Sequence, residues 1–173
     1  MPKKFEKEFI SYCENQNLEV NPNQIKVIKK LEDYHNSNYK SFFSKLFSKQ
    51  KTKKGFYLYG GVGVGKTMIL NFFYDHLEEK KLKKHFNEFM LGFHDFVHEQ
   101  KEKNEENVIN QFVKNLKSKA SLVYFDEFQV TNIVDAMILG KLFEQIFKED
   151  IKIILTSNTK ISELYKEGLQ REQ

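Results

Sequence analysis

The chain has 173 residues, a formal charge of +4 and 40% hydrophobic residues, which suits one compact domain and excludes an intrinsically disordered chain. Its basic residues are 27 lysines and the single Arg171; because arginine is the better reader of bases, we do not expect nucleic-acid binding. One cysteine excludes an internal disulfide, and we find neither a secretory signal nor an apolar run of about 18 residues, so the sequence predicts a cytoplasmic protein without a membrane-spanning segment.

Helices are predicted in the first third of the chain. Asn21 and Pro22 form a typical helix start, and the following segment has apolar residues at helical spacing up to His35. An apolar stripe predicts a second, short helix after Tyr39, followed by a polar connector at 49–54. We assign residues 1–50 to an N-terminal helical extension and residues 51–173 to the main domain.

Strands and helices alternate in the rest of the chain. Short apolar runs predict strands at 56–59, 85–89, 122–125 and 151–155. Apolar residues at helical spacing predict helices at 67–82, 93–103, 108–119 and 134–147, and a last helix near Ile161. This alternation predicts an α/β fold in which helices sandwich a parallel sheet.

The most specific motif is GGVGVGKT, which matches the phosphate-binding pattern G-x-x-x-x-G-K-[ST]. Its glycines let backbone N–H groups turn toward phosphates without a side chain in the way. Lys66 is expected to reach the β- and γ-phosphates, and Thr67 to ligate Mg²⁺ at the positive end of the next helix. The sequence therefore predicts a site for a nucleoside triphosphate and Mg²⁺; that the nucleotide is ATP is what the family resemblance described below implies. The predicted nucleotide-binding residues are Gly60, Gly61, Val62, Gly63, Val64, Gly65, Lys66, Thr67 and Met68.

A second motif, LVYFDEF, places an acidic pair at the end of a predicted strand. Asp126 is predicted to bind Mg²⁺ through water, and Glu127 to orient or deprotonate the water that attacks the γ-phosphate. Beyond the next strand, Asn158 is predicted to bond that water and the γ-phosphate; the alternative is that it caps the helix near Ile161. The isolated Arg171 is a candidate arginine finger acting on a neighbouring subunit, or else a surface residue.

These motifs lie in longer stretches that resemble the ZapE-like (Afg-type) ATPases of the AAA+ superfamily. The resemblance spans about residues 22–171 and rests on GFYLYGGVGVGKTMIL, HFNEFMLGFH, YFDEFQVTNIVDAMILGKLFEQIF, ILTSN and LYKEGLQRE. It implies an AAA+ P-loop fold. It also implies a role for each candidate: Walker A for Lys66 and Thr67, Walker B for Asp126 and Glu127, sensor 1 for Asn158 and the arginine finger for Arg171.

The resemblance implies partners as well. Bacterial relatives destabilise FtsZ polymers at the division site in an ATP-dependent way, and mitochondrial relatives are linked to the turnover of respiratory-chain subunits. We therefore expect an ATPase that remodels a protein partner such as FtsZ and forms homo-oligomers through Arg171. Two alternatives stay open: a helicase-loader-like ATPase acting on single-stranded DNA, and a nucleotide-gated binding module without turnover.

The chain departs from the family pattern in three places. The family's HFHRFM reads HFNEFM here, with Asn87 and Glu88, and its VTDIADAMIL reads VTNIVDAMIL, with Asn132 and Val134. These substitutions lie outside the phosphate chemistry and bear on partner contacts. Relatives also continue past the position of Gln173 through another strand and a helical lid, so we expect the lid domain to be absent from this chain.

Overall fold

The computed structural model describes residues 4–38, 54–100, 104–130 and 133–164. These residues form two compact units: unit 1 is drawn from 1–56 and 65–78, and unit 2 from 57–64 and 79–173. The helix predicted after Tyr39, the domain boundary predicted at residue 50, Asn132 and Arg171 all lie outside the described residues.

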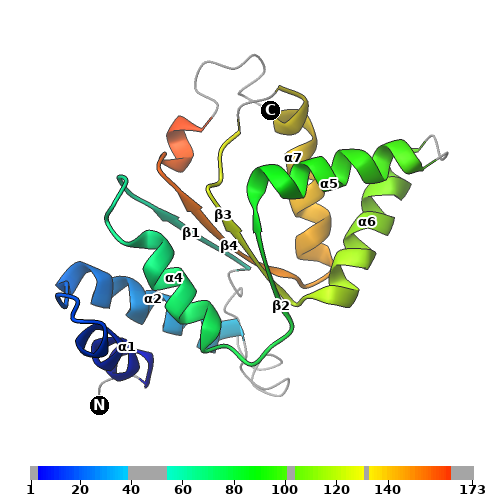
Figure 1. Cartoon of the computed structure of the whole chain (residues 1–173). Helices are drawn as coiled ribbons and strands as arrows, with labels where there is room; N and C mark the ends of the chain where they lie inside the picture. The colour runs from blue at the N-terminus through cyan, green and yellow to red at the C-terminus, as the bar shows by residue number, and fades with distance from the viewer. Residues whose placement is uncertain (1–3, 39–53, 101–103, 131–132, 165–173) are drawn as a thin grey trace. The chain divides into compact units, whose positions relative to one another are not determined.

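The described part of unit 1 consists of the helices α1 (Lys4–Asn15), α2 (Pro22–Asn38) and α4 (Lys66–Asp75) (Figure 1). The prediction of α2 is confirmed, and so is its start, because Asn21 Oδ1 accepts a hydrogen bond of 2.8 Å from the backbone N–H of Asn23. This cap fixes the first turn of α2.

Helix α1 was missed by the sequence analysis, although its buried residues Phe5, Phe9 and Cys13 recur every four positions. The ring of Phe5 lies 5.2 Å from that of Phe73, and the ring of Phe9 lies 5.0 Å from that of Phe72, so α1 covers the apolar side of α4. Burial, and then the charge of the adjacent glutamate, raise the pKa of the Cys13 thiol.

The sheet consists of β1 (Gly55–Tyr59), β2 (Lys81–His85), β3 (Leu122–Asp126) and β4 (Lys152–Ser157), in the order β1-β4-β3-β2. Strand β3 pairs in parallel with β2 on one side and with β4 on the other. Beyond β1, the N–H of Gly60 donates to the carbonyl of Ser157 at 3.2 Å, so β1 and β4 also end side by side. The predicted parallel sheet is confirmed.

Three predicted elements had wrong boundaries. The helix predicted at 93–103 begins at Phe86 and ends at Glu99. The helix predicted at 67–82 ends at Asp75, and the strand predicted at 85–89 lies instead at Lys81–His85. This strand reads KLKKH and forms an edge of the described sheet, where lysines are favoured because they discourage pairing with other chains. Helix α5 (Phe86–Glu99) follows at once, and its buried side chains have helical spacing: Phe86, Phe89, Met90 and Phe93.

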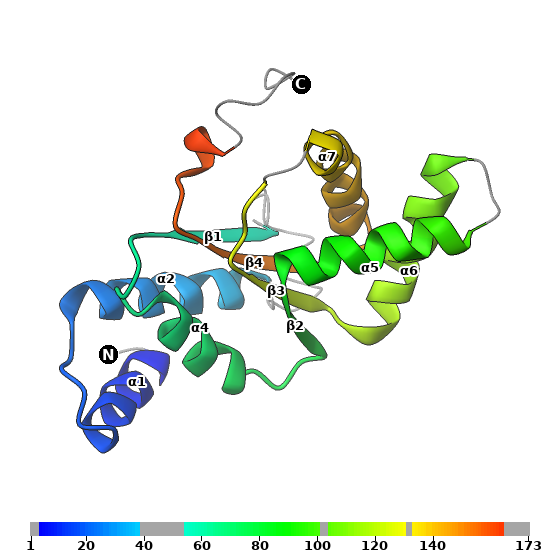
Figure 2. The ribbon, with the colours of Figure 1, turned by 45° about the horizontal axis from the view of Figure 1, so that its top comes forward.

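Three helices of unit 2 cover one face of the sheet: α5, α6 (Glu105–Lys119) and α7 (Ile133–Lys148) (Figure 2). Their apolar sides pack against Val123, Phe125 and Ile153, which face them from β3 and β4. A short 3₁₀ helix, η1 (Ile161–Glu163), follows β4. The sheet is thus flanked by helices, as predicted. The apolar core does not extend to the carboxyl ends of the strands, where polar residues lie.

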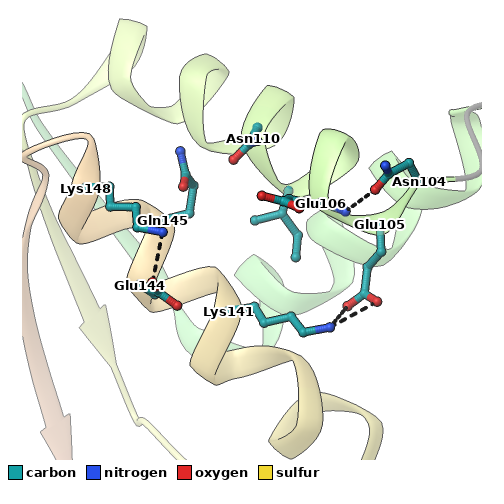
Figure 3. Close-up of a pocket in the computed structure, with 9 residues that line it drawn as sticks. Asn104, Glu105, Glu106, Asn110, Lys141, Glu144, Gln145 and Lys148 are labelled. Carbon is teal, nitrogen blue, oxygen red and sulfur yellow. Dashed lines mark hydrogen bonds and ion pairs between the residues drawn. The ribbon is translucent and has the colours of Figure 1, made fainter.

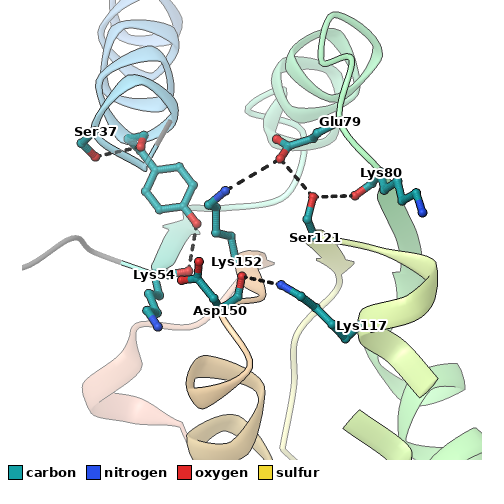
Figure 4. A network of polar contacts seen from close by, with 9 residues as sticks. Ser37, Lys54, Glu79, Lys80, Lys117, Ser121, Asp150 and Lys152 are labelled. Carbon is teal, nitrogen blue, oxygen red and sulfur yellow. Dashed lines mark hydrogen bonds and ion pairs between the residues drawn. The ribbon is translucent and has the colours of Figure 1, made fainter. Parts of the chain in front are cut away.

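A buried ion pair lies in the same unit (Figure 4). Lys152 Nζ is 3.9 Å from Glu79 Oε2, and the two side chains are only 9% and 10% exposed. Ser121 Oγ donates to the same carboxylate at 3.4 Å. Burial raises the pKa of Glu79 and lowers the pKa of Lys152, while the pairing opposes both shifts.

We predict that Lys152→Met lowers the free energy of unfolding by about 3 kcal/mol at pH 7, because it leaves the Glu79 carboxylate buried without its counter-ion. The loss should shrink as the pH falls toward 4.5, the ordinary pKa of a glutamate, because a protonated Glu79 needs no counter-ion. The matched control is Lys148→Met, which breaks the exposed pair with Glu144 and should change little. Urea unfolding at several pH values measures both; equal losses in the two variants would contradict the prediction.

Candidate functional site

The carboxyl ends of β1, β4 and β3 meet at one edge of the sheet in unit 2. Gly60, the first residue of the phosphate-loop motif, is bonded to Ser157 as described above. On the other side of β4, the N–H of Phe128 donates to the carbonyl of Thr156 at 2.7 Å, and Ser157 Oγ donates to the carbonyl of Phe128 at 2.7 Å. The structure therefore brings the start of the loop, the acidic pair and the end of β4 to one edge.

Asp126 is the last residue of β3 and is 6% exposed. The Thr156 hydroxyl donates to Asp126 Oδ1, and the N–H of Glu127 donates to the same oxygen at 3.1 Å. Two hydrogen bonds thus hold Oδ1 of this carboxylate and fix the direction of Oδ2. Burial, and then the charge of Asp126, raise the pKa of the neighbouring Tyr124 phenol, which therefore stays neutral.

Glu127 has a backbone φ of 56°, a left-handed conformation that is uncommon for a residue with a side chain. Its N–H also lies 3.2 Å from Thr156 Oγ1, so the β4 threonine helps to hold this conformation. The Glu127 side chain is 77% exposed, and its Oε2 lies 4.0 Å from Nδ1 of His85. Sequence reasoning missed both Thr156 and His85, because each depends on which strands are neighbours.

Asn158 follows β4 and is exposed. The alternative role as a helix cap is not found: the cap position of η1 is Lys160, and no side chain caps it. The polar turn is closed instead by Ser157 Oγ, which accepts a hydrogen bond of 3.1 Å from the N–H of Thr159. Tyr57 of β1 donates to the carbonyl of Thr159 at 2.6 Å and ties the turn to β1.

The phosphate-loop motif joins β1 to α4. Its first half lies in unit 2, where residues 61–64 are exposed, with Val62 at 86% exposure and Gly63 at a φ of 78°. Its second half begins α4 in unit 1, where Gly65 has a φ of 85° and no side chain caps the helix. The first N–H groups of a helix have no partner within the helix, so the start of α4, with Lys66 and Thr67, has the chemistry of an anion site.

A different hollow of about 360 Å³ lies between α6 and α7 (Figure 3). Two ion pairs join four of its five charged side chains: Lys141 lies 3.3 Å from Glu105, and Lys148 lies 2.8 Å from Glu144. None of the residues that line it belongs to the predicted site. They are Asn104, Glu105, Glu106, Ile109, Asn110, Lys141, Glu144, Gln145 and Lys148.

The described residues contain no group of three or more His, Cys, Asp or Glu side chains that could hold a metal ion. None of the described helices combines the length and hydropathy needed to cross a membrane.

Comparison with known proteins identifies the family. Residues 11–173 match the family model described as AFG1-like ATPase. The chain is 40% identical over 149 residues to Lactation elevated protein 1 homolog B of Danio rerio, covering 80% of this chain and 30% of that protein. It is 38% identical over 125 residues to the cell division protein ZapE of Escherichia coli K12, covering 72% of this chain and 33% of that protein. The chain thus spans about a third of the length of these relatives.

Solved structures share the fold. DnaI matches with a TM-score of 0.52 at 21% identity, over 88% of this chain and 78% of that chain. The replication initiator DnaA bound to AMPPCP and single-stranded DNA matches with a TM-score of 0.58 at 17% identity, over 91% of this chain and 44% of that chain. At these identities the likeness shows the fold alone: a parallel sheet flanked by helices. With the family model matching nearly the whole sequence, the chain belongs to the AFG1-like ATPase family.

Proposed function

We propose that this chain binds ATP with Mg²⁺ and hydrolyses it. The observation that carries the proposal is the edge of unit 2 at which Gly60, the Asp126–Glu127 pair and the end of β4 are joined by hydrogen bonds. Those groups match, in kind and in order, the parts of a P-loop ATPase site. Membership of the AFG1-like ATPase family supports the same activity.

The residues present fit the predicted ligands. The positive end of α4 and the ammonium group of Lys66 suit the phosphates, and Thr67 adds a hydroxyl for Mg²⁺. Asp126 adds a carboxylate whose Oδ1 is held by two hydrogen bonds, which fixes the direction of Oδ2. Bound Mg²⁺ would neutralise negative charge on the phosphate oxygens.

In the proposed reaction, water attacks the γ-phosphorus of ATP while the bond from that phosphorus to the β–γ bridging oxygen breaks. The water proton passes to the carboxylate of Glu127, the bridging oxygen leaves with ADP, and inorganic phosphate is released. Asn158, exposed at the end of β4, orients the water through its side-chain amide. The left-handed backbone of Glu127 positions this base separately from Asp126.

We further propose that hydrolysis drives the remodelling of a protein partner in the cytoplasm, and that FtsZ is the partner in a bacterial cell. The support is the identity to the Escherichia coli protein named as a cell division protein. Sedimentation of FtsZ polymers with and without the chain and ATP tests this part; polymers that resist the chain at every ATP concentration would count against it.

Two substitutions should separate binding from hydrolysis. We expect Lys66→Ala to abolish ATP binding, because it removes the cation for the β- and γ-phosphates. We expect Glu127→Gln to lower the ATPase rate by roughly 100-fold or more and to leave ATP binding intact, because an amide cannot accept the proton. Calorimetry and phosphate release measure the two quantities, with Glu99→Gln, at an exposed position of α5, as the control. An undiminished rate in either variant would defeat the proposed function.

Thr156 should act as a positioning residue for the acidic pair. We expect Thr156→Val, which keeps the shape and removes the hydroxyl, to lower kcat about tenfold and to raise the Mg²⁺ concentration needed for half-maximal rate, because Asp126 and Glu127 lose a shared partner. Thr156→Ser should restore most of both. A purely structural role would lower the unfolding midpoint while leaving the Mg²⁺ dependence unchanged.

Arg171 is proposed to complete the site of a neighbouring subunit. A chain carrying Arg171→Ala and a chain carrying Glu127→Gln should each be nearly inactive, whereas their mixture should regain activity, because some sites then combine an intact Glu127 with a neighbour's Arg171. The phosphate-release rate of the mixture, followed against protein concentration, measures this. A mixture no faster than its components would show that Arg171 does not act between subunits.

A further inference from the structure

Gln24 lies directly against the last glycine of the phosphate loop. A Cβ atom built on Gly65 would come 2.6 Å from Gln24 Nε2, closer than real side-chain contacts allow, so the amide occupies the space that this glycine leaves open. Both residues belong to unit 1, and both are half-buried. Gln24 lies outside the motifs GGVGVGKT and LVYFDEF, and those motifs do not distinguish ATP from GTP.

The position of Gln24 is fixed by the start of its helix. It is the third residue of α2, two positions after Pro22, and the Asn21 cap holds this turn through the bond to Asn23. Helices α1 and α4 share an aromatic core within the same unit, which supports α4 beside this turn. The amide is therefore presented by a supported helix turn rather than by a loop.

Met68 borders the same space. Its Cε would lie 3.6 Å from the Cβ built on Gly65, so a polar amide and a thioether methyl group both border the surface of this glycine. An aromatic ring is favoured next to a methionine sulfur, and an amide can pair with the edge of a base through one donor and one acceptor. The two side chains together have the chemistry of a purine site: the methionine can contact the face of the ring, and the amide can hydrogen-bond with its edge.

An amide discriminates between purines. A glutamine donates to adenine N7 and accepts from its N6 amino group, whereas guanine presents two acceptors, N7 and O6, at the same edge. In a P-loop site, Lys66 and Thr67 lie at the β- and γ-phosphates. The nucleoside is attached to the α-phosphate, at the opposite end of the triphosphate. Gly65, Met68 and Gln24 are neighbours beside the first turn of α4, at the start of which the phosphates bind.

Building on the proposed ATPase function, we propose that Gln24 recognises the adenine base and gives the site its preference for ATP over GTP. Gly65 is then required for two reasons: its φ of 85° and the room it leaves for the amide. A bidentate amide–base pair favours the right base roughly 5- to 150-fold.

The experiment compares Gln24→Met with the unchanged 173-residue chain. Methionine keeps the length and the apolar stem of glutamine and removes both hydrogen-bonding atoms. Calorimetry in Mg²⁺ measures the affinities for ATP, GTP and inorganic tripolyphosphate, and thermal unfolding checks the fold. Asn23→Ala, in the same helix turn but exposed, is the matched control, and Lys66→Ala marks the loss of phosphate binding.

We expect Gln24→Met to lower ATP affinity roughly 5- to 150-fold, to leave tripolyphosphate affinity unchanged, and so to erase the ATP-to-GTP ratio, while Asn23→Ala keeps it. A glutamine that only supported the helix start would move the unfolding midpoint and not this ratio. An unchanged ratio in Gln24→Met would overturn the inference and leave the proposed function standing. Failure of the unchanged chain to bind either ATP or tripolyphosphate would overturn the proposed function, and the inference with it.

Discussion

The site of unit 2 depends on the pairing between the ends of β3 and β4. The hydroxyl of Thr156 donates a hydrogen bond to Asp126 and lies beside the N–H of Glu127. The carbonyl of Thr156 accepts a hydrogen bond from the N–H of Phe128. One residue of β4 thereby fixes the buried carboxylate, the left-handed turn after it and the exit of the chain from β3. Ser157, the next residue, extends the same connection to Phe128 and to Gly60. The chemistry proposed for this edge needs these groups to be rigid before any ligand arrives, and the paired strands supply that rigidity.

The sequence predicts a feature well where the signal is local. The α/β alternation follows from short apolar runs and is confirmed, and the candidate residues of GGVGVGKT and LVYFDEF can be picked out within a few residues of sequence. It was insufficient where a role depends on neighbours distant in the chain. Thr156 and His85 contact Glu127 because β4 and β2 flank β3, and Gln24 contacts Gly65 because α2 begins next to that glycine. No local pattern encodes these adjacencies.

Strand β2 was misplaced for a different reason. Its sequence KLKKH has the composition of a solvated helix face, whereas an edge strand tolerates lysines because its outer side faces water. The signal that could have located it was the helical spacing of the phenylalanines that follow, which requires α5 to begin at Phe86. Helix α1 carried a similar signal in Phe5 and Phe9, hidden among charged residues.

The buried thiol of Cys13 has a practical consequence. It is the chain's only cysteine, it is fully enclosed by the helices of unit 1, and burial raises its pKa, so little reactive thiolate forms near neutral pH. Maleimide and iodoacetamide reagents should therefore react with Cys13 only slowly in the folded chain. A cysteine introduced at an exposed position could carry a fluorophore or spin label without first removing the native one, and modification of Cys13 would itself report that unit 1 has opened.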